Sequence, residues 1–414
     1  MSTATLIALF LIVAKTIAEF VLNRLNRRQV LAHADRVPAA FREFIDDGTY
    51  QKSVQYTLAK SRFGQVEDLF NSLLLVVVLF SGFLPWAFAN YTTHFGPSVA
   101  SMAGFLFLIG IVLAIPALPF DWHSQFRLEA RFGFNTTTPK LWWLDRLKGF
   151  LLGFVIGVPL LALLLKLVDW SRSRWWIYGW ICLTVFQLVM SILAPILILP
   201  WFNKFSLLPD GSLKDRLLAL AKRTNFRAAA IQVMDGSKRS THSNAFFTGL
   251  GRFRKIVLFD TLIQQLSDSE LEAVLAHEIG HYRKRHIPKF FLVSSAATLG
   301  GFYVVSWLSH QIWFYQAFGF SPGPIAPAFL LFGLLAGTVS FWISPLMNLW
   351  LRHHEYQADA FAVQSVGSPL PLITALRKLS EKNLSNLTPH PLYSRFYYSH
   401  PTLVEREQAL KPVR

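Results

Sequence analysis

The sequence has few charged residues and a single cysteine. Asp, Glu, Lys and Arg make up 15% of the 414 residues, whereas water-soluble domains usually carry about 25%. This shortage, with 53% hydrophobic residues and a mean hydropathy of +0.37, argues against intrinsic disorder and against an ordinary soluble enzyme. The lone Cys182 excludes an internal disulfide and a metal site built from paired thiolates.

Long apolar stretches are abundant in this chain. A transmembrane helix needs about 20 mostly apolar residues, and prolines inside such a stretch do not exclude a membrane helix. The sequence therefore predicts a mainly α, polytopic membrane protein with about seven transmembrane helices. The predicted spans are residues 4–23, 69–90, 98–119, 149–167, 175–200, 289–309 and 327–351.

The net charge of +16 comes from unevenly distributed basic residues. Of the 40 Lys and Arg residues, 35 lie in segments 24–68, 120–148, 201–288 and 352–414. Because loops rich in Lys and Arg stay in the cytoplasm, the N-terminus is predicted outside and the C-terminus inside. The membrane would be a bacterial inner membrane or, in a eukaryote, the endoplasmic reticulum. A nucleic-acid partner is not needed to explain the charge and is not expected.

Segment 201–288 is long enough to fold outside the lipid, and its patterning is mixed. Residues 212–224 are predicted to be helical, and Ala229–Met234 and Lys255–Asp260 have the apolar character of short strands. A helix is then predicted to begin at Ser267, because Ser267 and Glu270 have the spacing of a capping box.

The C-terminal segment is predicted to begin with a helix that continues from the seventh span. A second helix is expected near 369–382, before a loop-rich tail. The predicted organisation is a membrane region with five helices, the first part of a soluble domain, two further membrane helices, and the C-terminal part of the soluble domain. Their boundaries are 1–200, 201–288, 289–351 and 352–414.

The helix that begins at Ser267 contains the pentad HExxH, from His277 to His281. Residues at i and i+4 share one helix face, so both imidazoles can reach one metal ion. Glu278 lies beside them and is placed to act as a general base on a water molecule. The competing interpretation, two unrelated histidines on a polar helix surface, is weaker because the pentad is rare by chance.

A catalytic zinc ion takes three protein ligands and keeps one position open. We expect the third ligand to be Glu355, at the end of the seventh span, with His353 and His354 as weaker candidates. His286, five residues after His281, has the wrong spacing for the extended histidine motifs. Asp359 lies one helical turn beyond Glu355, where its carboxylate could hold a ligand imidazole in place.

Five sequence segments in this order resemble those of the type I CAAX prenyl proteases, which are integral-membrane zinc metallo-endopeptidases. The resemblance covers nearly the whole chain. HExxH alone indicates only a zinc peptidase, whereas the five segments together with seven spans are much more specific. The segments are Glu129–Thr138, Ser243–Gly249, His277–His281, Glu355–Ala362, and Tyr398–Pro401 followed by Arg406.

The resemblance implies a role for each matching residue. His277, His281 and Glu355 would hold one zinc ion per chain, and Glu278 would be the general base and later the proton donor. His400 would stabilise the oxyanion. The implied substrate contacts are Asn244 and Ala245, and the residues implied behind the metal ligands are Asp359 and Arg406; Arg406 is more readily explained as structural.

The implied architecture is a ring of seven helices around a chamber, closed on the cytoplasmic side by a zincin-like α+β metalloprotease domain. The implied substrate is a peptide or protein cut near its C-terminus, after a prenylated cysteine. A membrane quality-control protease with broad specificity is the alternative. A transporter or receptor with a structural zinc site is less favoured, because only three convincing ligands are found and Glu278 would then be idle.

Overall fold

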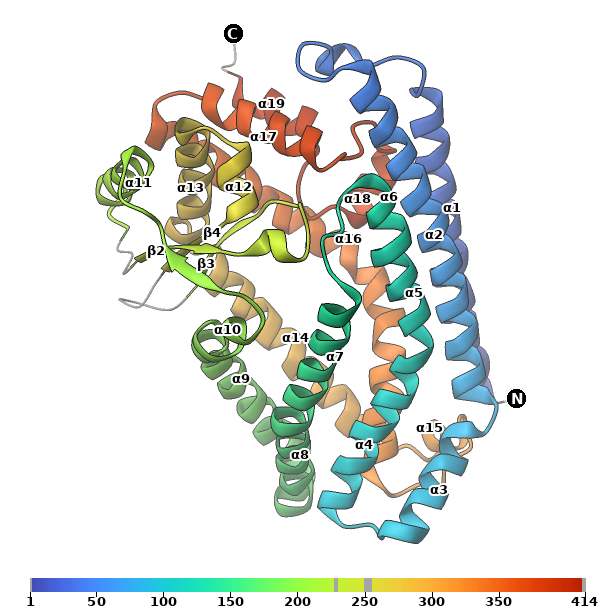
Figure 1. The fold of residues 1–414 in the computed structure, drawn as a ribbon. Coiled ribbons are helices and arrows are strands. Elements are labelled where there is room, and N and C mark those ends of the chain that lie inside the picture. Colours follow the sequence, from blue (N-terminus) through green and yellow to red (C-terminus); the bar gives the residue numbers. More distant parts are fainter. Residues whose placement is uncertain (1, 227–229, 249–254, 412–414) are drawn as a thin grey trace.

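The computed structural model describes residues 2–226, 230–248 and 255–411. Two residues named above lie outside these ranges: Gly249, which ends the segment Ser243–Gly249, and Ala229, which begins the predicted strand Ala229–Met234. Figure 1 shows long helices that stand side by side, with a smaller mixed α and β part against one end of them. The predicted architecture, membrane-length helices joined to a smaller α+β part, is confirmed.

The first half of the chain is almost entirely helical. Short 3-10 or π-helical segments join several of the helices, among them η3 (Ser124–Glu129), η4 (Gly153–Gly157) and η6 (Ala194–Ile198). The α-helices are α1 (Thr3–Ala32), α2 (Asp47–Phe80), α3 (Phe83–Phe95), α4 (Val99–Ala114), α5 (Leu118–His123), α6 (Ala130–Phe132), α7 (Pro139–Leu152), α8 (Val158–Ser171), α9 (Trp175–Leu193) and α10 (Leu199–Phe202).

Among the described residues, six helical runs are long and apolar enough to cross a membrane. They are Thr3–Ala32, Asp47–Phe80, Val99–Phe132, Pro139–Phe202, His286–Leu308 and Ile325–Val366. The run Pro139–Phe202 contains two of the predicted spans, because the chain reverses at η5 (Arg172–Arg174) and α9 packs back against α8. Arg172 makes this turn with a positive φ of 47°. The count of seven transmembrane helices stays a prediction.

The second predicted span, 69–90, is wrong in its boundaries. Helix α2 ends at Phe80, Gly82 adopts a φ of 80°, and α3 begins at Phe83. Glycine enters this left-handed region without a steric penalty, so the helix direction changes inside the apolar stretch. The apolar composition continues across the break, which is why composition alone did not reveal it.

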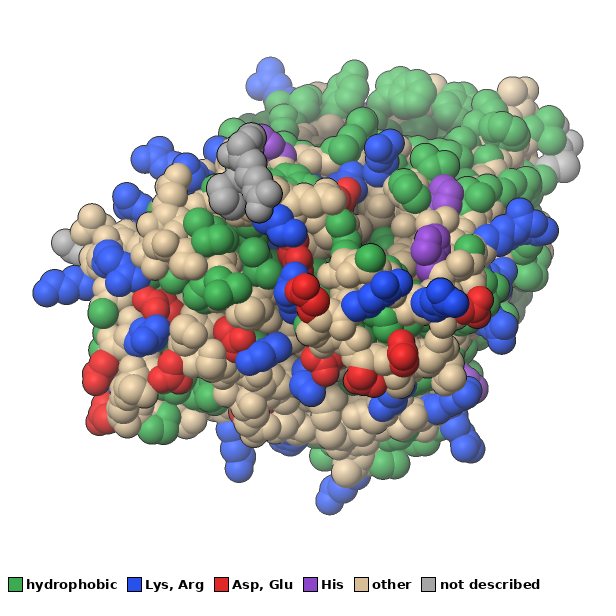
Figure 2. Space-filling model, turned by 90° about the horizontal axis from the view of Figure 1, so that it is seen from above, with side chains coloured by type: hydrophobic (Ala, Val, Ile, Leu, Met, Phe, Trp, Pro, Cys, Tyr) green, Lys and Arg blue, Asp and Glu red, His purple; other side chains and the backbone are tan. Residues whose placement is uncertain are grey.

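Two ends of the helical region differ in charge. The connections with few Lys and Arg residues, around α3, between α8 and α9 and around α15 (Ile312–Gln316), gather at the bottom of Figure 1, and the N-terminus lies toward that end. The C-terminus lies at the opposite end. Figure 2 shows that this opposite face carries many Lys and Arg side chains among fewer Asp and Glu. Inside the first span, Lys15 Nζ lies 3.3 Å from Glu19 Oε1, so these two side chains form an ion pair one helical turn apart.

The mixed part is built on one four-stranded sheet with strand order β1-β2-β4-β3. Strand β1 pairs antiparallel with β2, β2 pairs parallel with β4, and β3 pairs antiparallel with β4, which leaves β1 and β3 at the edges. The strands are β1 (Phe205–Leu207), β2 (Ala230–Met234), β3 (Ala245–Thr248) and β4 (Lys255–Phe259). The two strands predicted from the sequence are β2 and β4.

Helices from both soluble segments cover this sheet. Leu217, Leu258 and Leu271 from the first segment and Leu372 and Ala375 from the second are at most 1% exposed and belong to one core. Burying such side chains contributes roughly 1.5–3 kcal/mol each, which joins the two segments into one unit. The remaining α-helices of the chain are α11 (Ser212–Arg223), α12 (Asp260–Gln265), α13 (Asp268–Arg283), the membrane-length α14 (His286–Leu308) and α16 (Ile325–Val366), α17 (Leu370–Lys382), α18 (Pro391–Tyr397) and α19 (Leu403–Leu410).

Helices α13 and α16 position the site. The capping box predicted at the start of α13 is present, with Ser267 and Glu270 each bonding the other's backbone. Helix α16 runs without interruption for 42 residues from the membrane region into the soluble part, as predicted. At Gly280 the two helices cross so closely that a Cβ there would lie 2.9 Å from the Cα of Ala358. The missing side chain of Gly280 therefore sets the distance between α13 and α16.

Candidate metal centre

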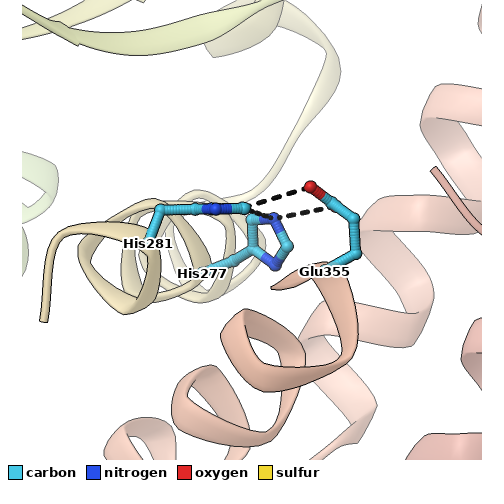
Figure 3. A group of neighbouring side chains, drawn as sticks. All are labelled: His277, His281 and Glu355. Atoms are coloured by element: carbon cyan, nitrogen blue, oxygen red, sulfur yellow. Dashed lines mark hydrogen bonds and ion pairs between the residues drawn. The ribbon is translucent and has the colours of Figure 1, made fainter. Parts of the chain in front are cut away.

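His277, His281 and Glu355 meet where α13 crosses α16. Figure 3 shows both imidazoles on α13 directed toward the carboxylate of Glu355 on α16. The two Nε2 atoms lie 3.1 Å apart, and they lie 3.4 Å and 3.3 Å from the Glu355 oxygens. A tetrahedral ion with zinc-like bond lengths of about 2.0–2.1 Å would hold its ligand atoms roughly 3.3–3.4 Å apart. The three side chains therefore have the spacing of a tetrahedral metal site.

The chemistry of the three side chains also fits a metal ion. Glu355 is 6% exposed, and its Oε2 atom is buried without a hydrogen-bond partner among the described residues. A buried carboxylate oxygen in this state is costly unless a cation satisfies it. Two imidazole nitrogens and one carboxylate oxygen form a ligand set of catalytic zinc sites and leave a fourth position open.

A buried charged pair supports His277 from behind. Nδ1 of His277 lies 2.8 Å from Oδ1 of Asp359, and Nε of Arg406 donates to Oδ2 of Asp359 over 2.8 Å. Asp359 is 1% exposed and Arg406 8%. Burial alone would lower the pKa of His277, but the carboxylates of Asp359 and Glu355 raise that pKa to about 9. Asp359 holds one proton on Nδ1, so the proton that a metal ion must displace is the one on Nε2.

Glu278 follows His277 on α13 and is half-buried. Burial raises the pKa of its carboxyl group, and the neighbouring imidazoles of His277 and His281 oppose this rise. A carboxylate whose pKa is shifted toward neutrality can both accept and return a proton, as general acid–base catalysis requires.

His400 reaches the same site from the segment between α18 and α19. Its Nε2 lies 3.5 Å from Oε1 of Glu355, and its Nδ1 lies 3.0 Å from the hydroxyl of Ser399. The side chain is 64% exposed, so its ring is accessible to a ligand in the site. A cavity of about 330 Å³ is lined by His400 together with Tyr398 and Thr402.

Asn244 and Ala245 lie at the start of β3, the edge strand that packs against α13. Asn244 is exposed, and its Oδ1 accepts a hydrogen bond of 2.8 Å from the backbone N–H of Ala245. Ala245 is 8% exposed and pairs with Leu258 of β4. Of these two residues, therefore, Asn244 presents its side chain outward and Ala245 takes part through its backbone.

The segment Glu129–Thr138, one of the five segments that carry the resemblance, packs against the loop before Asn244. Asn135 forms an isolated β-bridge with Ser240, and the Thr137 hydroxyl donates to the carbonyl of Arg239. His242 Nε2 lies 3.5 Å from Oε2 of Glu129. These contacts connect the membrane helices to the strand that carries Asn244.

The weaker candidate ligands lie outside the group. His353 is exposed, and the ring of His354 stacks on that of His286 with centroids 4.0 Å apart. Among the described residues, His277, His281 and Glu355 form the one group of three metal-ligating side chains. The sequence argued against His286 as a ligand, and the group does not include it, but its contact with His281 was not predicted: Nδ1 of His286 lies 3.1 Å from Nδ1 of His281. Arg285, with a φ of 57°, turns the chain between α13 and α14 and brings His286 back, and no spacing rule reveals such a turn.

Two larger cavities lie in the helical region. An apolar cavity of about 930 Å³ lies among α1, α14, α15 and α16, with Leu11, Val304 and Phe332 in its wall. A polar cavity of about 560 Å³ lies between α1, α2 and residues 383–398, and Lys60 and His242 are among its lining residues. The polar cavity thus approaches the loop that leads to Asn244.

Comparison with known proteins places two family models on the chain. Residues 26–204 match the model described as CAAX prenyl protease N-terminal, five membrane helices, and residues 207–414 match Peptidase family M48. Together they cover nearly all of the chain.

Individual relatives match over similar lengths. The chain is 39% identical to CAAX prenyl protease 1 of Saccharomyces cerevisiae over 401 residues, which cover 91% of this chain and 88% of the relative. It is 35% identical to CAAX prenyl protease 1 homolog of Arabidopsis thaliana over 93% of both chains, and 30% identical to the human homolog over 94% of this chain and 91% of the relative. The crystal structure of S. mikatae Ste24p matches with a TM-score of 0.93 and 36% identity, covering 99% of this chain and 100% of that chain.

Proposed function

The chain belongs to the CAAX prenyl protease family of M48 metallopeptidases, and we propose that it uses zinc to cut prenylated, CAAX-type substrates near their C-terminus. The observation that carries the proposal is the group of His277, His281 and Glu355, at tetrahedral spacing beside Glu278. A structural metal site would use all four positions, whereas this group provides three ligands and an adjacent acid–base residue.

Zinc, when bound by these three ligands, would polarise a water molecule and the scissile carbonyl. Glu278 takes the proton from the attacking water and later returns it to the leaving amine; its raised pKa suits both steps. His400 donates from Nε2 to the oxyanion of the tetrahedral intermediate. The Ser399 hydroxyl, 3.0 Å from Nδ1, favours this assignment if it donates there and so leaves the proton of His400 on Nε2.

The free edge of β3 is suited to an extended substrate. Strand β3 ends the sheet and packs against α13, so a peptide paired with it would lie along the helix that carries HExxH. Asn244 would hold the peptide backbone through its Nδ2 donor, because its Oδ1 already accepts from Ala245. Ala245 would contribute backbone shape rather than a side-chain contact.

The membrane setting suits a lipidated substrate. With the Lys- and Arg-rich end in the cytoplasm, the metal site and the C-terminus would face the cytoplasm and the N-terminus the other side. A prenyl chain would stay in an apolar environment while its peptide enters the site. The partners are therefore the bilayer and a peptide or protein, and no nucleic acid is proposed.

One peptide offered in two forms tests this proposal. Detergent-purified protein would be incubated with a peptide that is either farnesylated or bare at its cysteine, with Glu278→Gln as the blank. Fast cleavage of the farnesylated form alone, abolished in the blank, is the expected result. Equal cleavage of both forms would keep the peptidase and replace lipid recognition with broad membrane proteolysis. Cleavage of neither form would overturn the proposed substrate class.

A further inference from the structure

His286 is a buried histidine that the proposed reaction does not use. It is the first residue of α14, and its side chain is 4% exposed. Its Nδ1 lies 3.1 Å from Nδ1 of His281, and its Nε2 lies 2.9 Å from Oε1 of Gln357 on α16. Both ring nitrogens therefore contact polar atoms, and the ring joins a metal-ligand residue to α16.

The direction of these hydrogen bonds follows from donor chemistry. The amide oxygen of Gln357 can only accept, so Nε2 of His286 donates to it. A neutral imidazole has one N–H, so Nδ1 of His286 must accept, and the donor is Nδ1 of His281. The proton of His281 is then on Nδ1, and its Nε2 lone pair faces Glu355 Oε1 at 3.3 Å.

Rotating the Gln357 amide so that its oxygen and nitrogen change places would reverse the direction of each of these hydrogen bonds. Its NH₂ group would donate to His286, His286 would donate to His281, and the proton of His281 would move to Nε2, where the metal must bind. The amide nitrogen of Gln357 instead lies 2.8 Å from Nε2 of His353, where it can donate. Both ends of the Gln357 amide thus have a histidine partner, and the orientation in the structure is the one that leaves the Nε2 lone pair of His281 for a metal ion.

The plane of the His286 ring is fixed as well. His354 stacks on it with an interplanar angle of 11°, and Trp350 lies against the other ring of this pair, His354, at 4.4 Å. Stacking limits rotation of the ring, and the two hydrogen bonds set which edge faces His281. The neighbours of His286 therefore fix the orientation of its ring and do more than fill the space around it.

We propose that His286 is a positioning residue: together with Gln357 it holds His281 in the tautomer and orientation that present Nε2 to the metal. The role rests on the zinc site of the proposed function. Partners that orient metal-ligating histidines from behind typically change metal affinity by about 10- to 100-fold when they are removed. His286 would do for His281 what Asp359 does for His277, with a neutral acceptor in place of a carboxylate.

The test is the zinc dissociation constant of the full-length, metal-stripped protein in detergent, measured by competition with a chelator of known affinity. His286→Phe keeps an aromatic ring for stacking but removes the acceptor, and should weaken zinc binding by about 10- to 100-fold. His286→Gln can accept again through its amide oxygen and should recover most of the loss. The matched control His354→Phe keeps an aromatic ring stacked on His286 and leaves both hydrogen bonds of His286 in place, so it should bind zinc like the parent.

The outcomes separate positioning from packing. The thermal midpoint of metal-free His286→Phe shows whether this variant folds; if it does not, Gln357→Met removes the acceptor that directs His286 and should also weaken zinc binding. Unchanged zinc affinity in both variants, or an equal loss in His354→Phe, would overturn the role of His286. A parent chain that bound no zinc would instead overturn the proposed function itself.

Discussion

The two histidines of the metal site lie one turn apart on α13, yet their Nδ1 atoms, which do not face the metal position, have different partners. His277 donates to Asp359, whose charge is balanced by Arg406, and both of these side chains are almost fully buried. His281 contacts a neutral imidazole and, through it, the amide of Gln357. The comparison teaches that one side of the site depends on a buried charged pair, and the other on the direction of neutral hydrogen bonds.

Removing the carboxylate of Asp359 should have the largest effect. Asp359→Ala leaves Arg406 charged and buried without its partner, and breaking a buried ion pair in this way costs about 3–5 kcal/mol. We expect a markedly lower thermal midpoint in detergent and loss of zinc at equilibrium. Asp359→Asn keeps a hydrogen-bond acceptor for His277 but leaves the charge of Arg406 unbalanced, so its midpoint should fall as well. A midpoint equal to that of the parent would contradict the dependence on a buried charged pair.

Gly280→Ala should act on both sides of the site at once. The added Cβ would lie 2.9 Å from the Cα of Ala358, so α13 and α16 must separate. Overpacking of this kind costs typically about 1–3 kcal/mol, and it moves both imidazoles away from Glu355. We expect weaker zinc binding and a lower thermal midpoint. Gly300→Ala, on α14 with no atom within 4 Å of the added Cβ, should leave both values unchanged.

Stability and zinc affinity should also depend on pH through His277. In the metal-free protein the pKa of His277 is raised to about 9 from an ordinary value of 6.5. A raised pKa stabilises the folded state fully below pH 6.5, and this contribution is lost as the pH rises to about 9. Zinc must displace the same proton, so zinc affinity should increase by about tenfold per pH unit between pH 7 and 9. Chelator competition across this range measures it, and Asp359→Asn should flatten the profile.

How much of this could be read from the sequence depends on whether a contact is local. The pairing of His277 with His281 follows from helical periodicity, and the capping box at Ser267 follows from a three-residue spacing. Glu355 lies 74 positions after His281, and its choice over His353 and His354 was strengthened by resemblance to a family. The structure brings it to the site through the close crossing at Gly280.

Features set by single backbone torsions were missed. The break in the second span depends on Gly82 at a φ of 80°, inside a stretch whose composition is continuously apolar. The return of His286 toward His281 depends on Arg285 at a φ of 57°. Strands β1 and β3 have three and four residues, too few for alternation to appear, and only pairing with β2 and β4 defines them.

The smallest effect on zinc affinity is expected from His353, the exposed histidine that contacts Gln357 on the His281 side of the site. His353 accepts from Gln357, but its side chain is exposed, so water can replace it as the acceptor. His353→Ala should change zinc affinity by less than about twofold, because the Gln357 oxygen still faces His286. A loss as large as that of His286→Phe would place the directing group at His353 instead.

The central claim is that Glu278 transfers protons beside the metal ion and is not a metal ligand. This claim has the most direct test. The measurement is zinc content and peptide cleavage in the same preparation of Glu278→Gln and of the parent. One zinc per chain in both proteins, with a cleavage rate reduced by about 10²- to 10⁴-fold in Glu278→Gln, is the predicted result. A Glu278→Gln protein that keeps its zinc and cleaves at the parent rate would contradict it.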